Sequence, residues 1–79
     1  MYTHLRYGLS RSEWDKLIEE WIFIAEHRTI MRESILDGMS HGEIAERHNL
    51  SVDRIRAILR NDRHTLFEKA EEMIKERPA

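Results

Sequence analysis

The sequence predicts an all-α protein, a small helical bundle of four to five helices that contains a helix-turn-helix. Three observations support this class. Apolar residues recur at helical spacing along most of the chain, no segment alternates in the manner of a strand, and two serines stand three residues before a glutamate at predicted helix starts. With 79 residues and 41% hydrophobic content, the chain is expected to be near the smallest size at which one core suffices without cross-links.

We expect a single domain over residues 1–79, in three parts. An N-terminal arm covers residues 1–10, the helix-turn-helix residues 40–60, and a C-terminal helical extension residues 61–76. The chain contains no repeat, linker or low-complexity tract that would divide it.

The first helix is predicted to begin after Ser10, which has capping-box spacing with Glu13. Its continuous apolar face consists of Trp14, Leu17, Ile18, Trp21 and Ile22. Core packing is the favoured interpretation of the two tryptophans, with a contact to a dimer mate or another protein as the alternative. Phe23 and Ile24 extend the apolar run around the helix, which predicts either burial on more than one side or a partner.

A break is expected at Ala25 to His27, followed by a second helix that ends at Gly38. The residues expected to face inward are Ile30, Met31, Ser34 and Ile35. Because Ile24-Ala25 is a poor helix cap, one continuous helix over residues 11–36 is the alternative.

The third helix opens the helix-turn-helix. Ser40 and Glu43 form a second capping-box pair, so this helix is predicted to begin at His41 and to place Ile44 and Ala45 on its inner face. The small side chain at Ala45 lets a second helix cross close to it.

Residues 48–51 are predicted to form the turn. Asn49 tolerates the left-handed backbone that ends a helix, Leu50 fills the core and Ser51 caps the next helix. His48 occupies a position that is usually apolar, which predicts a partly buried imidazole at the helix end.

The fourth helix begins at Val52 with the apolar stripe Val52, Ile55, Ile58 and Leu59. The residues left outside are Asp53, Arg54, Arg56, Ala57 and Arg60. A capped helix with arginines on its free face is suited to the major groove of DNA. The helix need not stop at Arg60, because the apolar positions Leu66, Phe67, Ala70, Met73 and Ile74 continue the pattern. That tail either packs back on the first helix or binds a partner.

Charge is unevenly distributed. The net charge of −2 argues against strong indiscriminate binding to nucleic acid, which depends on neutralising phosphates. Between Arg54 and Arg63, however, four arginines accompany one acid, Asp62. A local basic patch on an acidic molecule fits a specific, weak or cooperative DNA binder, or one that works inside a larger complex.

Several short motifs occur together in this chain: I-L-D-G at residues 35–38, E-I-A at 43–45, N-L-S-V at 49–52, R-I-R at 54–56 and L-F at 66–67. With them, residues 27–67 resemble region 4 of bacterial sigma factors of the sigma-70 family. The resemblance is closer still to the short stand-alone phage and prophage proteins that carry this module. The segment YGLSRSEWDKLIEEWIF at residues 7–23 resembles the opening of those small proteins.

The resemblance implies that the helix beginning at Val52 reads promoter DNA and that the module also contacts RNA polymerase. Carried over by position, the reading residues are Ser51, Val52, Asp53, Arg54, Arg56, Ala57 and Arg60, and the basic patch adds Arg63. The expected partners are double-stranded DNA, RNA polymerase and a second copy of the chain. A chain of 79 residues leaves no room for the region that melts the promoter, so a complete sigma factor is not expected.

Other classes of function find no support in the sequence. There is no cysteine, and the five histidines lack a recognised metal-ligand spacing, so no metal or other cofactor is expected. The chain has no phosphate-binding glycine loop and no convincing catalytic triad, which argues against an enzyme or a small-molecule substrate. With no signal peptide or membrane-length apolar stretch, a cytoplasmic protein is expected.

Two function classes therefore remain open. The first is a sequence-specific DNA-binding transcriptional regulator. The second is a protein-interaction module that keeps the helix-turn-helix fold but docks on RNA polymerase or a sigma factor without reading DNA. Asp53 and the acidic total favour the second a little, whereas the arginines between Arg54 and Arg63 favour the first more.

Overall fold

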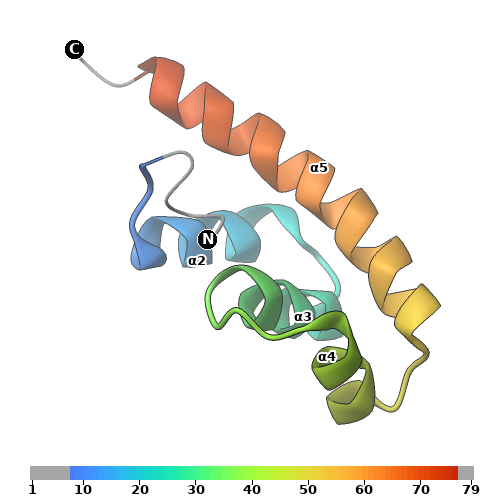
Figure 1. Ribbon diagram of the computed structural model, residues 1–79. Helices are drawn as coiled ribbons and strands as arrows, with labels where there is room; N and C mark the ends of the chain where they lie inside the picture. Colours follow the sequence, from blue (N-terminus) through green and yellow to red (C-terminus); the bar gives the residue numbers. More distant parts are fainter. Residues whose placement is uncertain (1–7, 77–79) are drawn as a thin grey trace.

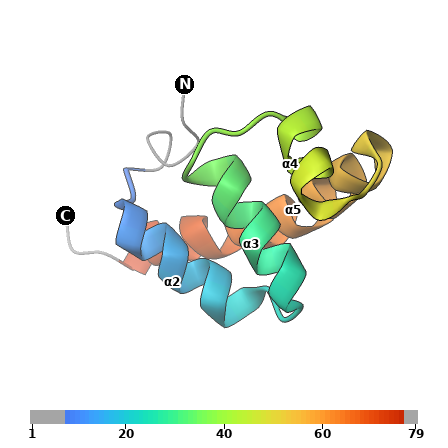
Figure 2. The same ribbon diagram turned by 90° about the horizontal axis from the view of Figure 1, so that it is seen from below.

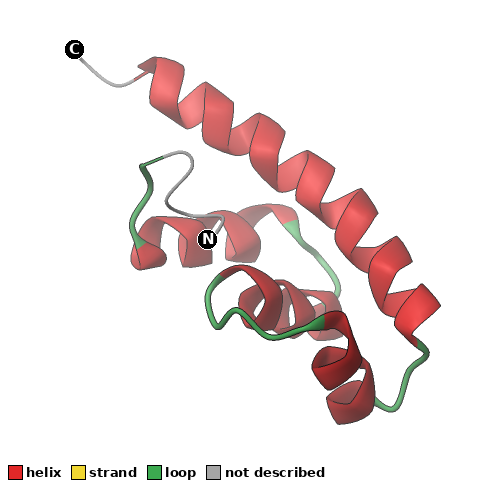
Figure 3. Ribbon diagram, viewed as in Figure 1, coloured by secondary structure: helices red, strands yellow, loops and turns green. Residues whose placement is uncertain are grey.

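The computed structural model describes residues 8–76, which form helices joined by short turns and contain no strand (Figures 1 and 3). Its helices are α2 (Arg11–Trp21), α3 (Ala25–Ile35), α4 (His41–His48) and α5 (Val52–Glu76). The all-α prediction is confirmed. Most of the predicted N-terminal arm, residues 1–7, lies outside the described residues.

Both predicted capping boxes are present, and they set the starts of α2 and α4. Ser10 Oγ accepts from the Glu13 backbone N–H at 3.2 Å, and Glu13 Oε1 accepts from the Ser10 N–H at 3.0 Å. The pair at Ser40 and Glu43 repeats this exchange at 3.2 and 3.3 Å. Each box satisfies two backbone donors that a helix start leaves without partners.

The break between α2 and α3 occurs earlier than predicted. Ile22 and Ile24 have extended backbones, with ψ angles of 109° and 121°, and Ala25 already begins α3. The predicted break at Ala25 to His27 is therefore wrong, and so is the alternative of one helix over residues 11–36. The physical reason lies in tertiary contacts: Ile22 is buried, and its carbonyl accepts a hydrogen bond from Arg28 Nη1 at 2.9 Å, which replaces a local cap.

The apolar residues at this turn are on the surface. Phe23 is 80% exposed and Ile24 57%, so of the two predicted alternatives, burial on more than one side is wrong and contact with a partner stays a prediction. The two tryptophans also differ. Trp14 is fully buried as predicted, but Trp21 is 38% exposed, with Lys69 Nζ 4.2 Å from its ring centre.

Helix α5 extends along the other helices and contacts α2, α3 and α4 (Figures 1 and 2). It continues without a break past Asn61 and Asp62, and its tail packs back on α2. There the Phe67 and Trp14 rings meet edge to face, 6.0 Å apart. The fully buried side chains that share this core are Trp14, Ile18, Ile30, Met31, Ile35, Ile44, Ile55, Leu59 and Leu66.

In α3, the inward face differs from the prediction at one pair of neighbours. Ile30, Met31 and Ile35 are buried as predicted, but Ser34 is only partly buried while Glu33 is 4% exposed. Gly38, predicted to end this helix, has a φ of 68° in the turn after it.

Among the described residues, no helix is both long and apolar enough to cross a membrane.

Candidate nucleic-acid interface

The turn between α4 and α5 has the predicted geometry. Asn49 lies in the left-handed region with φ 55° and ψ 44°. The Leu50 N–H bonds the Ala45 carbonyl at 2.9 Å, and the half-buried Leu50 side chain packs against the core. Ser51 Oγ accepts from the Arg54 backbone N–H at 3.1 Å, which caps the start of α5. These contacts place the first turns of α5 beside α4 as a helix-turn-helix.

The end of α4 is attached to α3 through charged groups. The predicted partly buried imidazole of His48 is confirmed, since its side chain is 14% exposed. Its Nε2 lies 2.6 Å from Oε1 of Glu33, and Arg47 Nε lies 2.7 Å from the other oxygen of the same carboxylate. Glu26 approaches His48 Nδ1 at 3.6 Å. This network holds the end of α4, and thereby the turn, against the bundle.

Most of the predicted site residues are accessible on α5. The exposed ones are Ser51, Val52, Asp53, Arg54, Arg56 and Arg60, whereas Ala57 and Arg63 are partly buried. Arg54 and Arg56 are two positions apart, about 200° around the helix, so they lie on different sides of it. The predicted site is therefore divided between two flanks of α5.

The arginines of this structure fall into two groups according to their partners. Each described arginine before Val52 meets a carboxylate: the pairs are Arg11–Asp37, Arg28–Glu19, Arg32–Asp15, Arg32–Glu19 and Arg47–Glu33. The hydrogen bond to Asp15, aided by that to Glu19, raises the pKa of Arg32 despite some burial. These guanidinium groups are neutralised within the protein.

Among the arginines of α5, Arg54, Arg60 and Arg63 lack such partners within the described part of the chain, and Arg56 is paired no more closely than Arg28 is with Glu19, at 3.8 Å. Within residues 8–76, no carboxylate lies within 4.0 Å of the Arg54 or Arg60 side chains, and Arg56 reaches only Asp53 at 3.8 Å. Arg63 donates from Nη2 to the uncharged Ser34 hydroxyl at 3.0 Å. Positive charge therefore remains available on the first half of α5.

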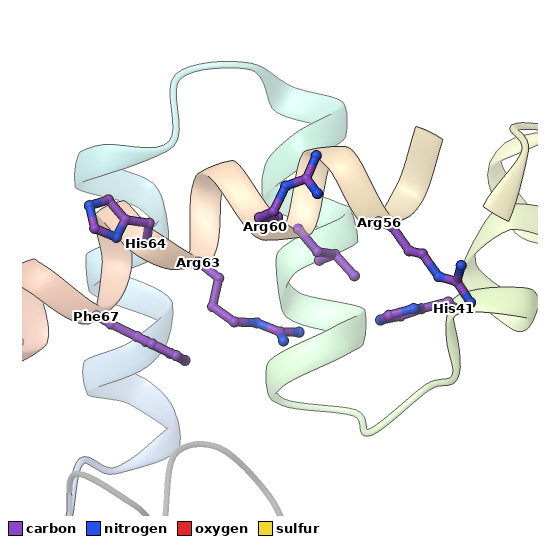
Figure 4. A pocket seen from close by; sticks show the side chains of 7 residues that line it. His41, Arg56, Arg60, Arg63, His64 and Phe67 are labelled. Atoms are coloured by element: carbon purple, nitrogen blue, oxygen red, sulfur yellow. The ribbon is translucent and has the colours of Figure 1, made fainter. Parts of the chain in front are cut away.

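Three of these arginines line one pocket of about 400 Å³ between α4 and α5 (Figure 4). Its lining consists of His41, Arg56, Leu59, Arg60, Arg63, His64 and Phe67. His41 and His64 were not predicted to belong to the site. The spacing of Arg56, Arg60 and His64, four residues apart along a helix, could have indicated a shared face, but His41 comes from α4 and depends on how the helices cross.

Two further findings bear on function. Within residues 8–76, no group of three metal-ligating side chains is placed to hold a metal ion. No protein-family model, curated protein or solved structure matches the chain. The resemblance to region 4 of sigma factors therefore stays a prediction.

Proposed function

We propose that this protein is a sequence-specific DNA-binding transcriptional regulator that reads the major groove with the first half of α5. The observation that carries the proposal is the contrast between the arginines. Those before Val52 are paired with carboxylates of the protein, whereas Arg54 and Arg60 have no such partner among the described residues. An unpaired, solvated guanidinium on a free helix face is suited to bidentate contacts with guanine or with phosphate.

The capped start of α5 supports base reading in particular. Residues 51–57 form the end of the helix next to the turn, the part that enters the major groove in helix-turn-helix proteins. Asp53, whose side chain is 94% exposed, is suited to accept a hydrogen bond from a cytosine amino group. Arg54 and Arg56, on different flanks of the helix, would face different base pairs or strands.

The experiment begins with selection of a binding site from random duplexes by the full chain. Fluorescence polarisation on that site then compares the wild type with Arg56→Ala and Arg60→Ala, each expected to weaken binding by about 1 to 3 kcal/mol. Lys16→Ala is the matched control, because it removes one charge from an exposed side chain of α2. Circular dichroism should show unchanged helicity in all three variants. Equal binding by both arginine variants and the wild type would refute the assignment of α5 as the reading helix.

The second candidate is a protein-interaction module that docks on RNA polymerase or a sigma factor without reading DNA. The observation that favours it is the exposure of Phe23 and Ile24, because side chains of this kind are often covered in complexes. Titration of the labelled protein with RNA polymerase, with and without its sigma factor, separates the two candidates. Tight binding to the enzyme together with no duplex selected at any salt concentration would favour the second.

A further inference from the structure

We propose that the pocket between α4 and α5 binds a phosphate group of the DNA backbone, and that this pocket shares Arg56 and Arg60 with the exposed face of α5 but excludes Arg54 and the turn. The inference rests on the proposed DNA-binding function and adds a division of labour to it. Residues near the turn would read base edges, and the pocket around Arg60 and Arg63 would set the position and angle of the helix on the duplex.

The charge of the pocket is the first observation. Three arginines and two histidines line it, and no carboxylate does, although the chain carries more acidic than basic residues (15 against 13, histidines excluded). Two lining residues meet acids that are not part of the lining: His64 meets Glu68 at 3.7 Å, and Arg56 meets Asp53 at 3.8 Å. A concave surface lined by one sign of charge concentrates ions of the opposite sign. The occupant that fits is an anion.

The second observation is that one cation in the pocket is already oriented. Arg63 is held by its hydrogen bond to Ser34 on α3, and its Nε is buried with no hydrogen-bond partner among the described residues. A guanidinium that is partly withdrawn from water attracts an anion more strongly than a fully solvated one. Because its rotamer is set by α3, Arg63 also loses little conformational entropy on binding.

The apolar part of the lining identifies the anion more closely. Leu59 is 2% exposed and Phe67 is half-buried, and both line the same cavity as the arginines. At about 400 Å³ the cavity has room for much more than a small ion, since one water occupies about 30 Å³. A sugar-phosphate unit combines a negative group with a largely apolar ring and matches such a lining. In contrast, inorganic phosphate would use only the cationic part.

The placement of the pocket favours duplex DNA as the source of the phosphate. Arg56 and Arg60 belong both to the pocket and to the exposed face that the proposed function assigns to DNA. The pocket also includes His41, the first residue of α4, so a second helix contributes a side chain to it. A helix lying in the major groove has the phosphates of the flanking strands at its sides, where the pocket is.

The test uses the full chain and compares Arg63→Gln with Arg54→Gln. Each removes one charge from α5, but Arg54 is outside the pocket. Affinities for the selected duplex and for a scrambled duplex are measured over a range of salt concentrations. We expect Arg63→Gln to weaken binding to both duplexes by a similar factor. We also expect it to reduce the magnitude of the slope of log K against log salt by about one. We expect Arg54→Gln to weaken the selected duplex more than the scrambled one.

A third variant protects the test against a folding defect in Arg63→Gln. Ser34→Ala keeps the charge but removes the group that orients Arg63. It should weaken binding to both duplexes by a smaller factor than Arg63→Gln does, and it should leave the salt slope unchanged. Circular dichroism establishes that all three variants are folded before binding is compared.

Titration with inorganic phosphate alone, followed by NMR at the His41 and His64 amides, separates the sources of the anion. If Arg63→Gln binds both duplexes as tightly as the wild type does, with an unchanged salt slope, the pocket does not bind a DNA phosphate. The proposed function would then still stand. If inorganic phosphate shifts the NMR signals of these amides but the protein binds no duplex, then the proposed function is wrong, and so is the inference that the phosphate comes from DNA. A salt slope lowered only by Arg63→Gln supports the inference.

Discussion

Glu33 is the one charged side chain found buried among the described residues, and it connects two helices. Its carboxylate accepts from His48 at 2.6 Å and meets Arg47 at 2.7 Å. A buried carboxylate is tolerated only when its oxygens have such partners. The sequence predicts the covered imidazole of His48 from its place in an apolar slot, but it contains no sign of Glu33, because carboxylates occur on every side of α3 and only the crossing of α4 selects one.

We predict that Glu33→Ala lowers the free energy of unfolding by about 1 to 3 kcal/mol, because it leaves His48 partly buried without its acceptor. Urea denaturation followed by circular dichroism measures this change. Glu46→Ala, which removes an exposed carboxylate from α4, is the control and should change stability by less than about 0.5 kcal/mol. If both variants melt alike, the network at Glu33 contributes nothing to the attachment of α4.

At the scale of elements, the helix starts are predicted more accurately than the break between α2 and α3. Local chemistry explains the success: Ser10 and Ser40 form capping boxes with residues three positions away. The break at Ile22 to Ile24 has no local cap and depends on Arg28, whose guanidinium satisfies the Ile22 carbonyl. A stop that depends on a side chain in the next helix leaves no pattern in sequence.

The turn of the helix-turn-helix gives a prediction of its own. Asn49→Ala should lower stability by about 1 kcal/mol, because a Cβ without a local polar group disfavours the left-handed backbone at φ 55°. Asn49→Gly, at the same position, should change stability by less than about 0.5 kcal/mol. Thermal melts of the two variants decide the matter, and equal losses for alanine and glycine would mean that the amide side chain, not the backbone, is what the turn needs.

At the scale of the whole molecule, α5 unites the domain, because it contacts each of the other described helices. The sequence predicts this helix from Val52 onward, together with its apolar tail. It leaves open whether the tail packs against the first helix or binds a partner. The Phe67–Trp14 contact decides for packing. Apart from Ser51, which caps the helix, the predicted DNA-reading residues are on α5 but on two flanks. The grouping of three arginines with His41 depends on helix crossings that a single sequence does not specify.

We predict that Leu66→Ala lowers the free energy of unfolding by about 2 to 5 kcal/mol and loosens the whole domain, because Leu66 is fully buried where α5 meets the core. Hydrogen exchange should become faster at the amides of α4 and at the start of α5, far along the chain from the substitution. Glu71→Ala, at an exposed position of the same helix, should leave exchange unchanged. Faster exchange confined to the tail would show that α5 unfolds in two independent halves.

The exposed apolar turn gives a matched pair of variants for partner binding. Ile22→Ser should lower stability by about 2 to 5 kcal/mol, because Ile22 is 4% exposed, whereas Ile24→Ser, at 57% exposure, should change it by less than about 0.5 kcal/mol.

We expect DNA binding by a monomer to be modest and to strengthen with a partner at this turn. Sedimentation with and without the selected duplex tests this. A strictly monomeric wild type with nanomolar affinity in physiological salt would contradict it.

The central place of α5 also has a consequence during synthesis of the chain. Helices α2 and α3 cover their apolar faces with a helix whose buried residues, such as Leu66 and Ala70, are translated later. At about 5 to 20 residues per second, the ribosome needs roughly 2 to 7 s to proceed from Ile35 to Ala70. During that interval Ile30 and Met31 have no complete core to enter, so the nascent chain presents them to chaperones or to neighbouring chains. A polypeptide released near residue 60 would contain the whole helix-turn-helix and still lack a fold.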